Sequence, residues 1–309
     1  MTRDFAIAAA GGLLSALLYL SAPWGLFGPL LALFSPFPLF AVGFGLGLTA
    51  CALAVAAALL TAAVLGGLSG MLLFAVIYGV PALMIVRFAL LSRPNAEGQT
   101  EWYPPGLLLT WIALYAAGAF VATAIFITGP DGLERAISQH IDSLREIFPR
   151  SGQDGAPIDQ ALAATKPLFP FLVATWWMAF TIVNGTLAQG VLERRGLALR
   201  PSPDLTTTAL PHWFAGVMVA AIVVALLGSG WLSFLGGNVA RILCVPYFLV
   251  GLAVVHSVST AWPGRRAILF AVYLLLLLLG WIAVVVVAGL GFLDYWAGLR
   301  QRFGRPDRG

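Results

Sequence analysis

The sequence is poor in charged residues, and this shortage excludes an ordinary water-soluble globular protein. Only 10% of the 309 residues are Asp, Glu, Lys or Arg, whereas soluble domains carry about 25%. Too little polar surface remains to coat a soluble domain. The mean hydropathy is +0.94, and apolar runs of roughly 20 residues, the spanning length for a bilayer core, recur along the chain. We therefore expect an all-α integral membrane protein with many transmembrane helices.

The motifs of metal, nucleotide and hydrolytic chemistry are also missing. The chain has no HExxH sequence, no paired cysteine motif, no Walker lysine, and no serine–histidine–acid set within its apolar runs. Metal-dependent or hydrolytic catalysis inside a membrane needs clustered ligands or carboxylates. We therefore expect a protein that is not an enzyme and that uses no metal and no cofactor.

Cysteine and lysine are almost absent. Cys51 and Cys244 both fall inside apolar runs, where a free thiol behaves as a small core residue, so we expect neither a disulfide nor a metal pair. Lys166 is the only lysine, and all other basic residues are arginines. Basic residues in a membrane protein chiefly set its orientation, so the net charge of +4 does not indicate a nucleic-acid partner.

What the chain does contain is an apolar stretch rich in proline and glycine near its N-terminus, PLLALFSPFPLFAVGFGLG at 29–47. Each interior proline removes a backbone donor and clashes with the preceding helical turn. Broken apolar backbone is tolerated at membrane depth only where protein or a watery cavity surrounds it. The stretch predicts a discontinuous transmembrane segment buried among other helices.

The remaining apolar runs predict a single integral membrane domain, 1–309, with about eight or nine spans in the lipid bilayer. The predicted segments are 5–21, 26–41, 42–65, 68–91, 105–128, 167–191, 211–235, 238–260 and 267–292. If every segment crosses, the arginine-rich turns lie in the cytoplasm but the polar tail 293–309 lies outside. We favour a last run broken near Gly280, which returns the tail to the cytoplasm. On this exit helix, Asp294 and Arg300 are expected to form a local ion pair.

The long polar loop 129–165 contains an amphipathic pattern. Asp131 followed by Glu134 is a helix-start signature. Apolar residues then recur at helical spacing: Leu133, Ile137, Ile141, Leu144 and Phe148. The pattern predicts an amphipathic helix over 131–148 that lies flat on the membrane or caps the bundle. Acidic residues outnumber basic ones here, so we expect 131–165 to be an extracytoplasmic loop.

Four polar or aromatic residues inside the spans are candidate ligand-binding residues. Trp177, Thr181 and Asn184 project from one helical face, and His256 lies late in the eighth span. An asparagine at this depth needs a partner, which either an interhelical hydrogen bond or one wall of a small-molecule pocket provides. His256 is either a hydrogen-bonded packing residue or a group with a proton role, because histidine titrates near neutrality.

Small residues line one face of the first span. Ala8, Gly12 and Ala16 recur every four residues, so another helix can approach this face closely. The face serves either packing inside the protein or the docking of a separate membrane subunit. Gly/Ala faces of this kind also allow a homo-oligomer.

Several sequence motifs carry a family resemblance. They are GGLLSALLYL before the broken segment, NGTLAQGVLERRG at the end of the sixth span, LPHW at the start of the seventh, and the terminal GFLDYWAGLRQR. In these motifs the chain resembles the YybS-like family of bacterial predicted membrane proteins, which has no established function. The resemblance covers most of the chain and implies a multi-pass protein of the bacterial inner membrane.

The YybS-like family is in turn distantly similar to the substrate-binding subunits of energy-coupling-factor vitamin transporters. In those subunits a small-residue face on the first helix docks a coupling protein, and substrate binds from outside under an ordering loop. The positions that correspond are Ala8, Gly12 and Ala16 and the loop 129–165, although this chain has more spans than those subunits. The resemblance implies a membrane coupling subunit and ATPases as partners.

Two hypotheses therefore stay open. The chain is either a transport-related subunit that captures a small molecule, or a non-transporting membrane scaffold or assembly protein that acts through helix–helix association. A polar pocket under the amphipathic helix favours the first hypothesis, and a solidly packed bundle favours the second.

Overall fold

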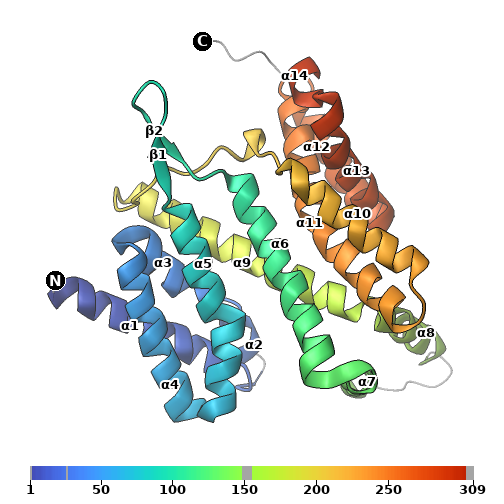
Figure 1. Ribbon diagram of the computed structural model, residues 1–309, viewed down its shortest axis with the longest axis horizontal. Coiled ribbons are helices and arrows are strands. Elements are labelled where there is room, and N and C mark those ends of the chain that lie inside the picture. The colour runs from blue at the N-terminus through green and yellow to red at the C-terminus, as the bar shows by residue number, and fades with distance from the viewer. Residues whose placement is uncertain (1, 26, 148–154, 304–309) are drawn as a thin grey trace. The chain divides into compact units, whose positions relative to one another are not determined.

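The computed structural model describes residues 2–25, 27–147 and 155–303 (Figure 1). The chain forms two compact units, the first made of Met1–Leu108 and Met178–Leu205 and the second of Leu109–Trp177 and Thr206–Gly309. Apart from one short hairpin, the regular elements of the described residues are helices. The predicted all-α class is confirmed.

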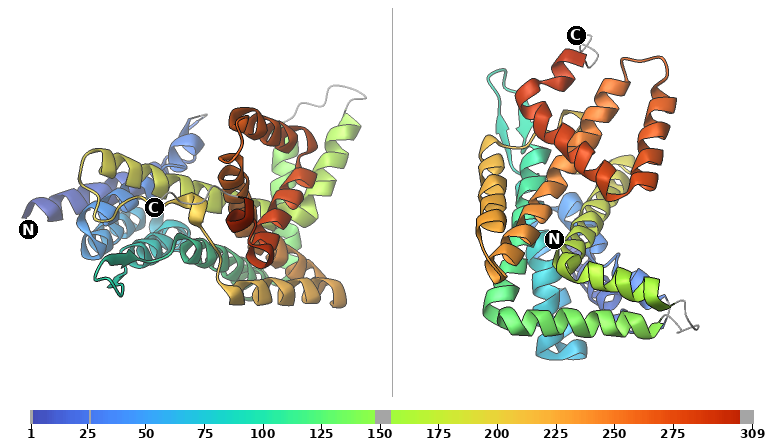
Figure 2. Two further views of the ribbon diagram at one scale, coloured as in Figure 1. Left: turned by 90° about the horizontal axis from the view of Figure 1, so that it is seen from above. Right: turned by 90° about the vertical axis from the view of Figure 1, so that its right-hand side faces the viewer.

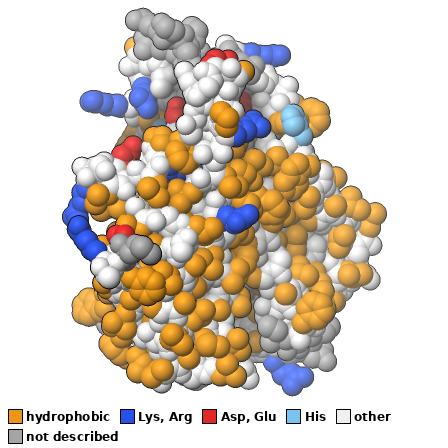
Figure 3. Space-filling view, turned by 60° about the vertical axis from the view of Figure 1, so that its left-hand side comes forward, with side chains coloured by type: hydrophobic (Ala, Val, Ile, Leu, Met, Phe, Trp, Pro, Cys, Tyr) orange, Lys and Arg blue, Asp and Glu red, His pale blue; other side chains and the backbone are white. Residues whose placement is uncertain are grey.

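The lengths of the helices identify membrane-spanning candidates. Six helices in the described residues are long and apolar enough to cross a membrane: Thr2–Leu20, Gly28–Leu46, Leu48–Ala89, Pro105–Phe126, Gln160–Arg194 and Trp231–Ser259. The segments predicted at 211–235 and 267–292 form helices of only 15 to 17 residues. The prediction of about eight or nine spans is therefore not confirmed. Hydrophobic side chains predominate on the face drawn in Figure 3, as expected for a membrane-embedded protein.

The first unit is built around the broken segment. Its elements are α1 (Thr2–Leu20), α2 (Gly28–Ala32), α3 (Pro36–Leu46), α4 (Leu48–Phe74), the π-helical η1 (Ala75–Gly79) and α5 (Val80–Ala89). Prolines occupy the first turns of α2 and α3, where the missing N–H has no helical partner to lose. Pro81 lies in the first turn of α5, directly after η1. The predicted break is confirmed between α2 and α3.

Serine side chains join the helices around this break by hydrogen bonds. Ser15 Oγ donates to the Ser35 carbonyl at 2.6 Å, and Ser35 Oγ donates back to the Ser15 carbonyl at 2.9 Å. Ser21 Oγ donates to the Gly28 carbonyl at 3.1 Å. Because the three serines are buried away from water, each bond gives a hydroxyl group a partner and removes the cost of leaving it unpaired.

Glycines set the next turns of the first unit. Gly47, with φ 97°, ends α3 and precedes α4. Gly67, with φ 70° and ψ −173°, interrupts α4 at the turn predicted between 65 and 68. The π-helical η1 precedes Pro81, and such a bulge commonly accommodates a kink.

The loop predicted after α5 is a short β-hairpin. Strand β1 (Ser92–Pro94) pairs antiparallel with β2 (Thr100–Trp102). Arg93 Nε donates to the Glu101 carboxylate at 2.8 Å across the hairpin. This hydrogen bond holds the pKa of Glu101 below its ordinary value.

The second unit contains the amphipathic helix and the C-terminal helices. Its helical elements are α6 (Pro105–Ala122) from Leu109 on, η2 (Thr123–Thr128), α7 (Gly129–Ile147), α8 (Gly155–Thr165), the 3₁₀ turn η4 (Lys166–Leu168), η5 (Leu205–Thr207) from Thr206 on, α10 (His212–Leu227), α11 (Trp231–Ser259), α12 (Arg265–Leu279), α13 (Trp281–Ala297) and α14 (Leu299–Phe303). Helix α9 (Phe169–Arg194) contributes residues to both units.

The boundary predicted between the seventh and eighth spans is wrong. The prediction placed it at 235–238, but α10 ends at Leu227 and α11 begins at Trp231. Gly230, with φ 53°, makes this turn. Gly236 instead lies inside α11 at a helix crossing, because a Cβ there would lie 2.6 Å from the Ala225 backbone nitrogen of α10.

The break predicted near Gly280 is confirmed. Gly280, with φ 54°, ends α12 and begins α13, and the two helices contact each other (Figure 2). Helix α11 packs closely on α13. At this crossing a Cβ on Gly251 would lie 1.8 Å from the Val287 carbonyl oxygen, so the two backbones are in direct contact.

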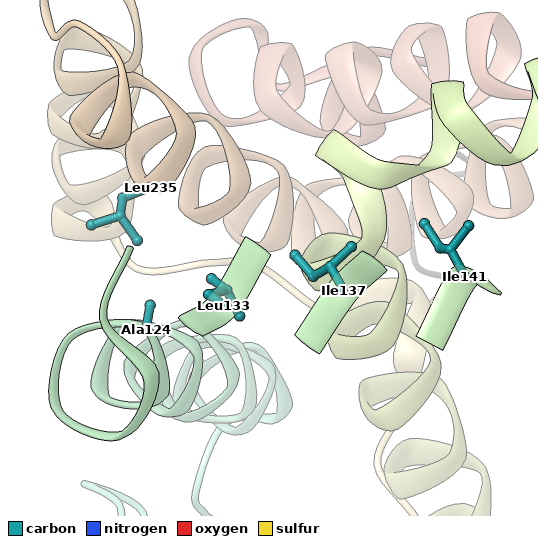
Figure 4. Packing of buried hydrophobic residues seen from close by; sticks show 5 residues of the cluster. All are labelled: Ala124, Leu133, Ile137, Ile141 and Leu235. Carbon is teal, nitrogen blue, oxygen red and sulfur yellow. The ribbon is translucent and has the colours of Figure 1, made fainter. Parts of the chain in front are cut away.

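Helix α7 buries the predicted apolar stripe. Leu133, Ile137 and Ile141 form a buried cluster with Ala124 and Leu235 (Figure 4). Phe120, Leu162, Phe169, Trp231 and Phe234 pack against this cluster. The Leu144 side chain and Phe148 lie outside the described residues. The amphipathic helix is therefore part of the second unit's core, with its polar face left outward.

Candidate functional site

Asn184 closes the break in the N-terminal segment. Its side chain is fully buried on α9, and its Nδ2 donates to the Leu33 carbonyl at 2.9 Å and to the Phe180 carbonyl at 2.8 Å. Leu33 is the C-cap residue of α2, so the bond satisfies a carbonyl that the break leaves without a helical partner. The interhelical hydrogen bond is therefore observed. The Asn184 Oδ1 has no hydrogen-bond partner among the described residues, and a ligand role for this residue stays a prediction.

Trp177 and Thr181 have separate surroundings. The Trp177 ring stacks on Tyr115 of α6 with ring centroids 5.6 Å apart, and both residues belong to the second unit. Thr181 is buried and, like Asn184, belongs to the first unit. Trp177 therefore packs within the second unit, whereas Thr181 and Asn184 are buried within the first. A ligand site that these three residues share stays a prediction.

His256 lies on α11 beside α12. Its Nε2 is 2.9 Å from the Tyr273 hydroxyl oxygen, so a hydrogen-bonded packing contact is present. Neither His256 nor the three candidates on α9 lines the pocket at α7 described below.

The small-residue face of α1 is covered within the first unit. Ala8 and Ala16 are fully buried, and a Cβ on Gly12 would lie 2.0 Å from the Ala54 carbonyl oxygen of α4. Of the two interpretations, internal packing describes the observed contact. Docking of a separate subunit stays a prediction. Because α4 covers the Ala8, Gly12 and Ala16 face, such a subunit has to bind another surface or displace α4.

We expect Gly12→Val to destabilise the chain itself. A valine side chain at this position overlaps the α4 backbone, which cannot move as a side chain can, so a loss of about 3 kcal/mol is expected. The measurement is the melting temperature of the purified protein in detergent. Ala10→Val is the matched control, because Ala10 is exposed on the same helix. Equal melting temperatures for the two variants would contradict the packing described here.

A pocket lies beside the polar face of α7 in the second unit. Its volume is about 420 Å³, within the usual range for small-molecule sites. Helix α7, the turn η4 and the start of α11 form its walls. Its larger apolar lining residues are Leu133, Ile137, Pro167, Trp231 and Phe234. A wide apolar wall with a few polar groups is typical of a small-molecule site.

Two aromatic rings form one wall of the pocket. Trp231 and Phe234 stack with ring centroids 5.5 Å apart and an angle of 16° between their planes. Phe120 packs edge-on against Phe234 at 6.3 Å. The stacked rings form an apolar wall that can receive an apolar or aromatic group.

Three polar side chains face the same pocket. They are Glu134, Ser138 and Lys166. Lys166 Nζ donates to the Ser138 hydroxyl at 3.3 Å. Glu134 and Lys166 form no ion pair, although both are described. The pocket therefore presents one cation and one anion that do not neutralise each other by direct contact.

Asn238 of α11 positions the lysine side of the pocket. Its Nδ2 donates to the Pro167 carbonyl at 3.1 Å and to the Phe234 carbonyl at 3.0 Å, and its Oδ1 accepts from the Phe171 N–H at 3.2 Å. The side chain is buried. These bonds tie the turn that follows Lys166 to α11. This role of Asn238 was not predicted from the sequence.

Arg200 is a buried cation in the loop that follows α9. Its Nη1 donates to the carbonyl of Ala89, the last residue of α5, at 2.7 Å, and its guanidinium lies over the Trp102 ring at 5.7 Å. Burial lowers its pKa below the ordinary value. A cation at a helix C-terminus complements the helix dipole, so Arg200 stabilises the end of α5.

Arg300 and Asp294 form the predicted ion pair at the C-terminal end. Arg300 Nε and Nη2 each lie 2.7 Å from Asp294 Oδ2. Arg300 Nη1 donates to the carbonyls of Thr206 at 2.8 Å and Thr208 at 2.9 Å. The adjoining cavity, beside His212, holds about 30 Å³, which is room for one water molecule. The ion pair therefore stabilises the contact between α13, α14 and the loop at 206–208, and the cavity beside it is too small for a ligand.

Metal ligation finds no support in the described part of the chain. No group of three or more His, Cys, Asp or Glu side chains gathers there in a way that could hold a metal ion. Within the part of the chain that the structure describes, the α7 pocket combines stacked rings with one cation and one anion, and it is the candidate ligand site.

Comparison with known proteins gives a match at the level of a family. A protein-family model described as "Predicted membrane protein (DUF2232)" matches residues 12–295. Searches of curated proteins and of solved structures found no match. The matched range includes the broken segment, the α7 pocket and the crossing of α11 with α13.

Proposed function

The chain belongs to the family of predicted membrane proteins described as DUF2232, and from this premise we propose that it is a transport-related membrane subunit that binds a small molecule. The ligand occupies the pocket between α7, η4 and the start of α11. The protein resides in the bacterial inner membrane, and α7 lies on its extracytoplasmic side. In this arrangement the pocket opens toward the compartment from which a nutrient is taken up.

The pocket itself is the observation that supports this function. It combines about 420 Å³ of space with a wall of stacked aromatic rings and two opposite charges. A scaffold that acts only through helix packing gains nothing from such a site, because the pocket leaves open the space between α7, η4 and α11 that close packing fills. A binding protein gains from them, because they fix the orientation of a ligand.

The proposed role is binding rather than catalysis. The polar groups at the pocket are one carboxylate, one hydroxyl and one amine, without the activated nucleophile and base that acyl or phosphoryl transfer requires. Because the sequence has no Walker lysine, energy for uptake comes from partner ATPases through a membrane coupling subunit. These partners follow from the resemblance to energy-coupling-factor transporters.

A second candidate function is a membrane scaffold or assembly protein. It is favoured by Gly216 of α10, which is exposed and has no atom within 4 Å of an added Cβ. Ala220 is exposed four residues later on the same helix. A small-xxx-small face of this kind allows close approach of a second helix. A pure scaffold would not depend on the α7 pocket, so filling that pocket separates the two functions.

Filling the pocket with a large side chain tests the proposed function. Ser138→Trp places an indole in the pocket, and Gln139→Trp places the same group on the exposed face of α7 as a control. We expect a fraction of a bacterial metabolite extract to raise the melting temperature of the wild type and of Gln139→Trp by roughly 5 °C near saturation. Ser138→Trp should not respond.

Two results would contradict this proposal. One is a fraction that stabilises all three proteins equally, because its ligand then binds outside the α7 pocket. The other is the absence of any stabilising fraction while the three proteins remain folded and keep their helix–helix associations, which favours the scaffold.

A further inference from the structure

The two charges at the α7 pocket lie on different elements. Glu134 lies in the first turns of α7, and Lys166 begins η4 after α8. Both line the same pocket, and no ion pair joins them. Asn238 ties the backbone beside Lys166 to α11, so the chain segment that carries the lysine is fixed on that wall of the pocket.

We propose that the pocket selects a zwitterion, a molecule with an ammonium group and an anionic group on an apolar body. Lys166 binds the anionic group, Glu134 binds the ammonium group, and the stacked Trp231 and Phe234 receive the apolar body. The inference rests on the proposed function and names its ligand class.

A ligand with a single charge fits this pocket less well. An anion pairs with Lys166 but brings its negative charge close to Glu134. A cation pairs with Glu134 but brings its positive charge close to Lys166. Like charges placed together, or a charge left against an apolar wall, weaken binding. A zwitterion pairs with both groups, and its apolar body covers the rings.

The choice of lysine rather than arginine at position 166 indicates which anionic groups the pocket can bind. The chain has 17 basic residues, of which Lys166 alone is lysine. A lysine ammonium is a compact charge with three donors that can be shared between Ser138 and an incoming anion, whereas an arginine guanidinium is a planar fork. A pocket that binds either a carboxylate or a phosphate monoanion can use such a point charge.

Two sources can supply this chemistry at a membrane surface. One is a free amphipathic amino acid, and the other is the headgroup of phosphatidylethanolamine, which carries an ammonium and a phosphate on an apolar body. Both contain the same pair of charges, so an experiment has to separate them.

The single lysine gives a direct probe of the site. Reductive methylation with ¹³C-formaldehyde labels Lys166 and the α-amino group of the chain. The dimethylated amine keeps its positive charge and one N–H donor, which remains able to pair with an anion. The labelled protein is placed in phosphatidylglycerol nanodiscs and titrated with L-phenylalanine, with phenethylamine as the cation alone and with 3-phenylpropionate as the anion alone. The NMR resonance of dimethylated Lys166 reports binding.

We expect L-phenylalanine to half-saturate the shift at a concentration at least tenfold below that of either analogue. Glu134→Gln should remove the advantage of L-phenylalanine over 3-phenylpropionate. Asp142→Asn is the control, because it removes a carboxylate from α7 outside the pocket. In a second arm, phosphatidylethanolamine is added to the nanodiscs. A Lys166 shift that depends on Glu134 and resists free L-phenylalanine would identify the lipid headgroup as the source.

The inference is overturned if the three soluble probes bind with equal affinity, if 3-phenylpropionate binds best, or if no probe or lipid moves the Lys166 resonance. This failure is distinguishable from failure of the proposed function. If extract fractions stabilise the wild type but not Ser138→Trp while charge preference is absent, the pocket binds a ligand of another class. If Ser138→Trp has no effect either, the proposed function itself fails.

Discussion

Gly291→Val is expected to prevent the second unit from folding stably. A Cβ on Gly291 would lie 2.0 Å from the Tyr247 carbonyl oxygen and 2.6 Å from the Gly251 backbone nitrogen. Both are backbone atoms of α11, so no side-chain rotation relieves the overlap. The complementary contact, of Gly251 with the Val287 carbonyl oxygen, places a glycine on each helix at this crossing.

The expected loss exceeds that of ordinary overpacking. Extra methyl groups in a packed core cost about 1–3 kcal/mol when neighbouring side chains adjust, and here α11 and α13 must separate. Because α11 also packs on α10 and carries two residues of the pocket wall, its displacement affects the whole unit. We expect at least about 3 kcal/mol and little folded protein at 37 °C.

Gly289→Val is the matched control for this prediction. Gly289 lies on the same helix, and an added Cβ there meets no atom within 4 Å. Both variants lose one glycine and gain one valine on α13, so propensity effects cancel. The measurement is the monodisperse fraction in size-exclusion chromatography after heating in detergent. Similar profiles for the two variants would show that the α11–α13 crossing is not as close as described.

Arg300→Met is expected to lower the melting temperature by roughly 10 °C. Its side chain is 17% exposed and that of Asp294 is 6% exposed, so the substitution leaves a nearly buried carboxylate without its counter-charge. Removing one partner of a buried pair costs about 3–5 kcal/mol. The carbonyls of Thr206 and Thr208 also lose their donor, which adds to the loss.

Arg302→Met controls for the removal of an arginine from α14, because Arg302 is exposed on the same helix. We expect its melting temperature to stay within about 2 °C of the wild type, as for most surface substitutions. In the double variant Asp294→Asn with Arg300→Met, part of the stability should return because no charge remains unpaired. If the Arg300→Met variant were as stable as Arg302→Met, the proposed stabilisation by the Arg300–Asp294 ion pair would be contradicted.

The broken segment and the Gly280 turn could be predicted because their causes are local. Proline cannot continue a helix from within, and glycine reaches positive φ without strain, so both features are visible in the residues themselves. The α7 stripe was predictable for the same reason, since Leu133, Ile137 and Ile141 recur at helical spacing.

The boundary between α10 and α11 was missed because two glycine groups compete there. Gly228 and Gly230 make the turn, whereas Gly236 lies where α10 and α11 touch. A glycine at a turn and a glycine at a helix crossing look alike in a single sequence. Only the packing partner decides between them, and that partner is a tertiary feature.

The pocket could not be predicted because its residues are far apart in sequence. Glu134, Lys166 and Trp231 meet only when α7, η4 and α11 pack together. Two signals were nevertheless present. Lys166 is the sole lysine, and Asn238 is an amide buried in an apolar run, as Asn184 is. Both asparagines bond a carbonyl on their own helix and a carbonyl outside it, a role that needs the partner backbone to be known.

The most direct test of the account is to measure what the protein carries when purified. The wild type, Ser138→Trp and Gln139→Trp are extracted from bacterial membranes in mild detergent, and native mass spectrometry measures the bound mass of each. The account predicts the same small molecule or lipid on the wild type and on Gln139→Trp, and its loss from Ser138→Trp. An identical bound mass on all three proteins, or none on the wild type, would contradict the claim that the α7 pocket is a ligand site.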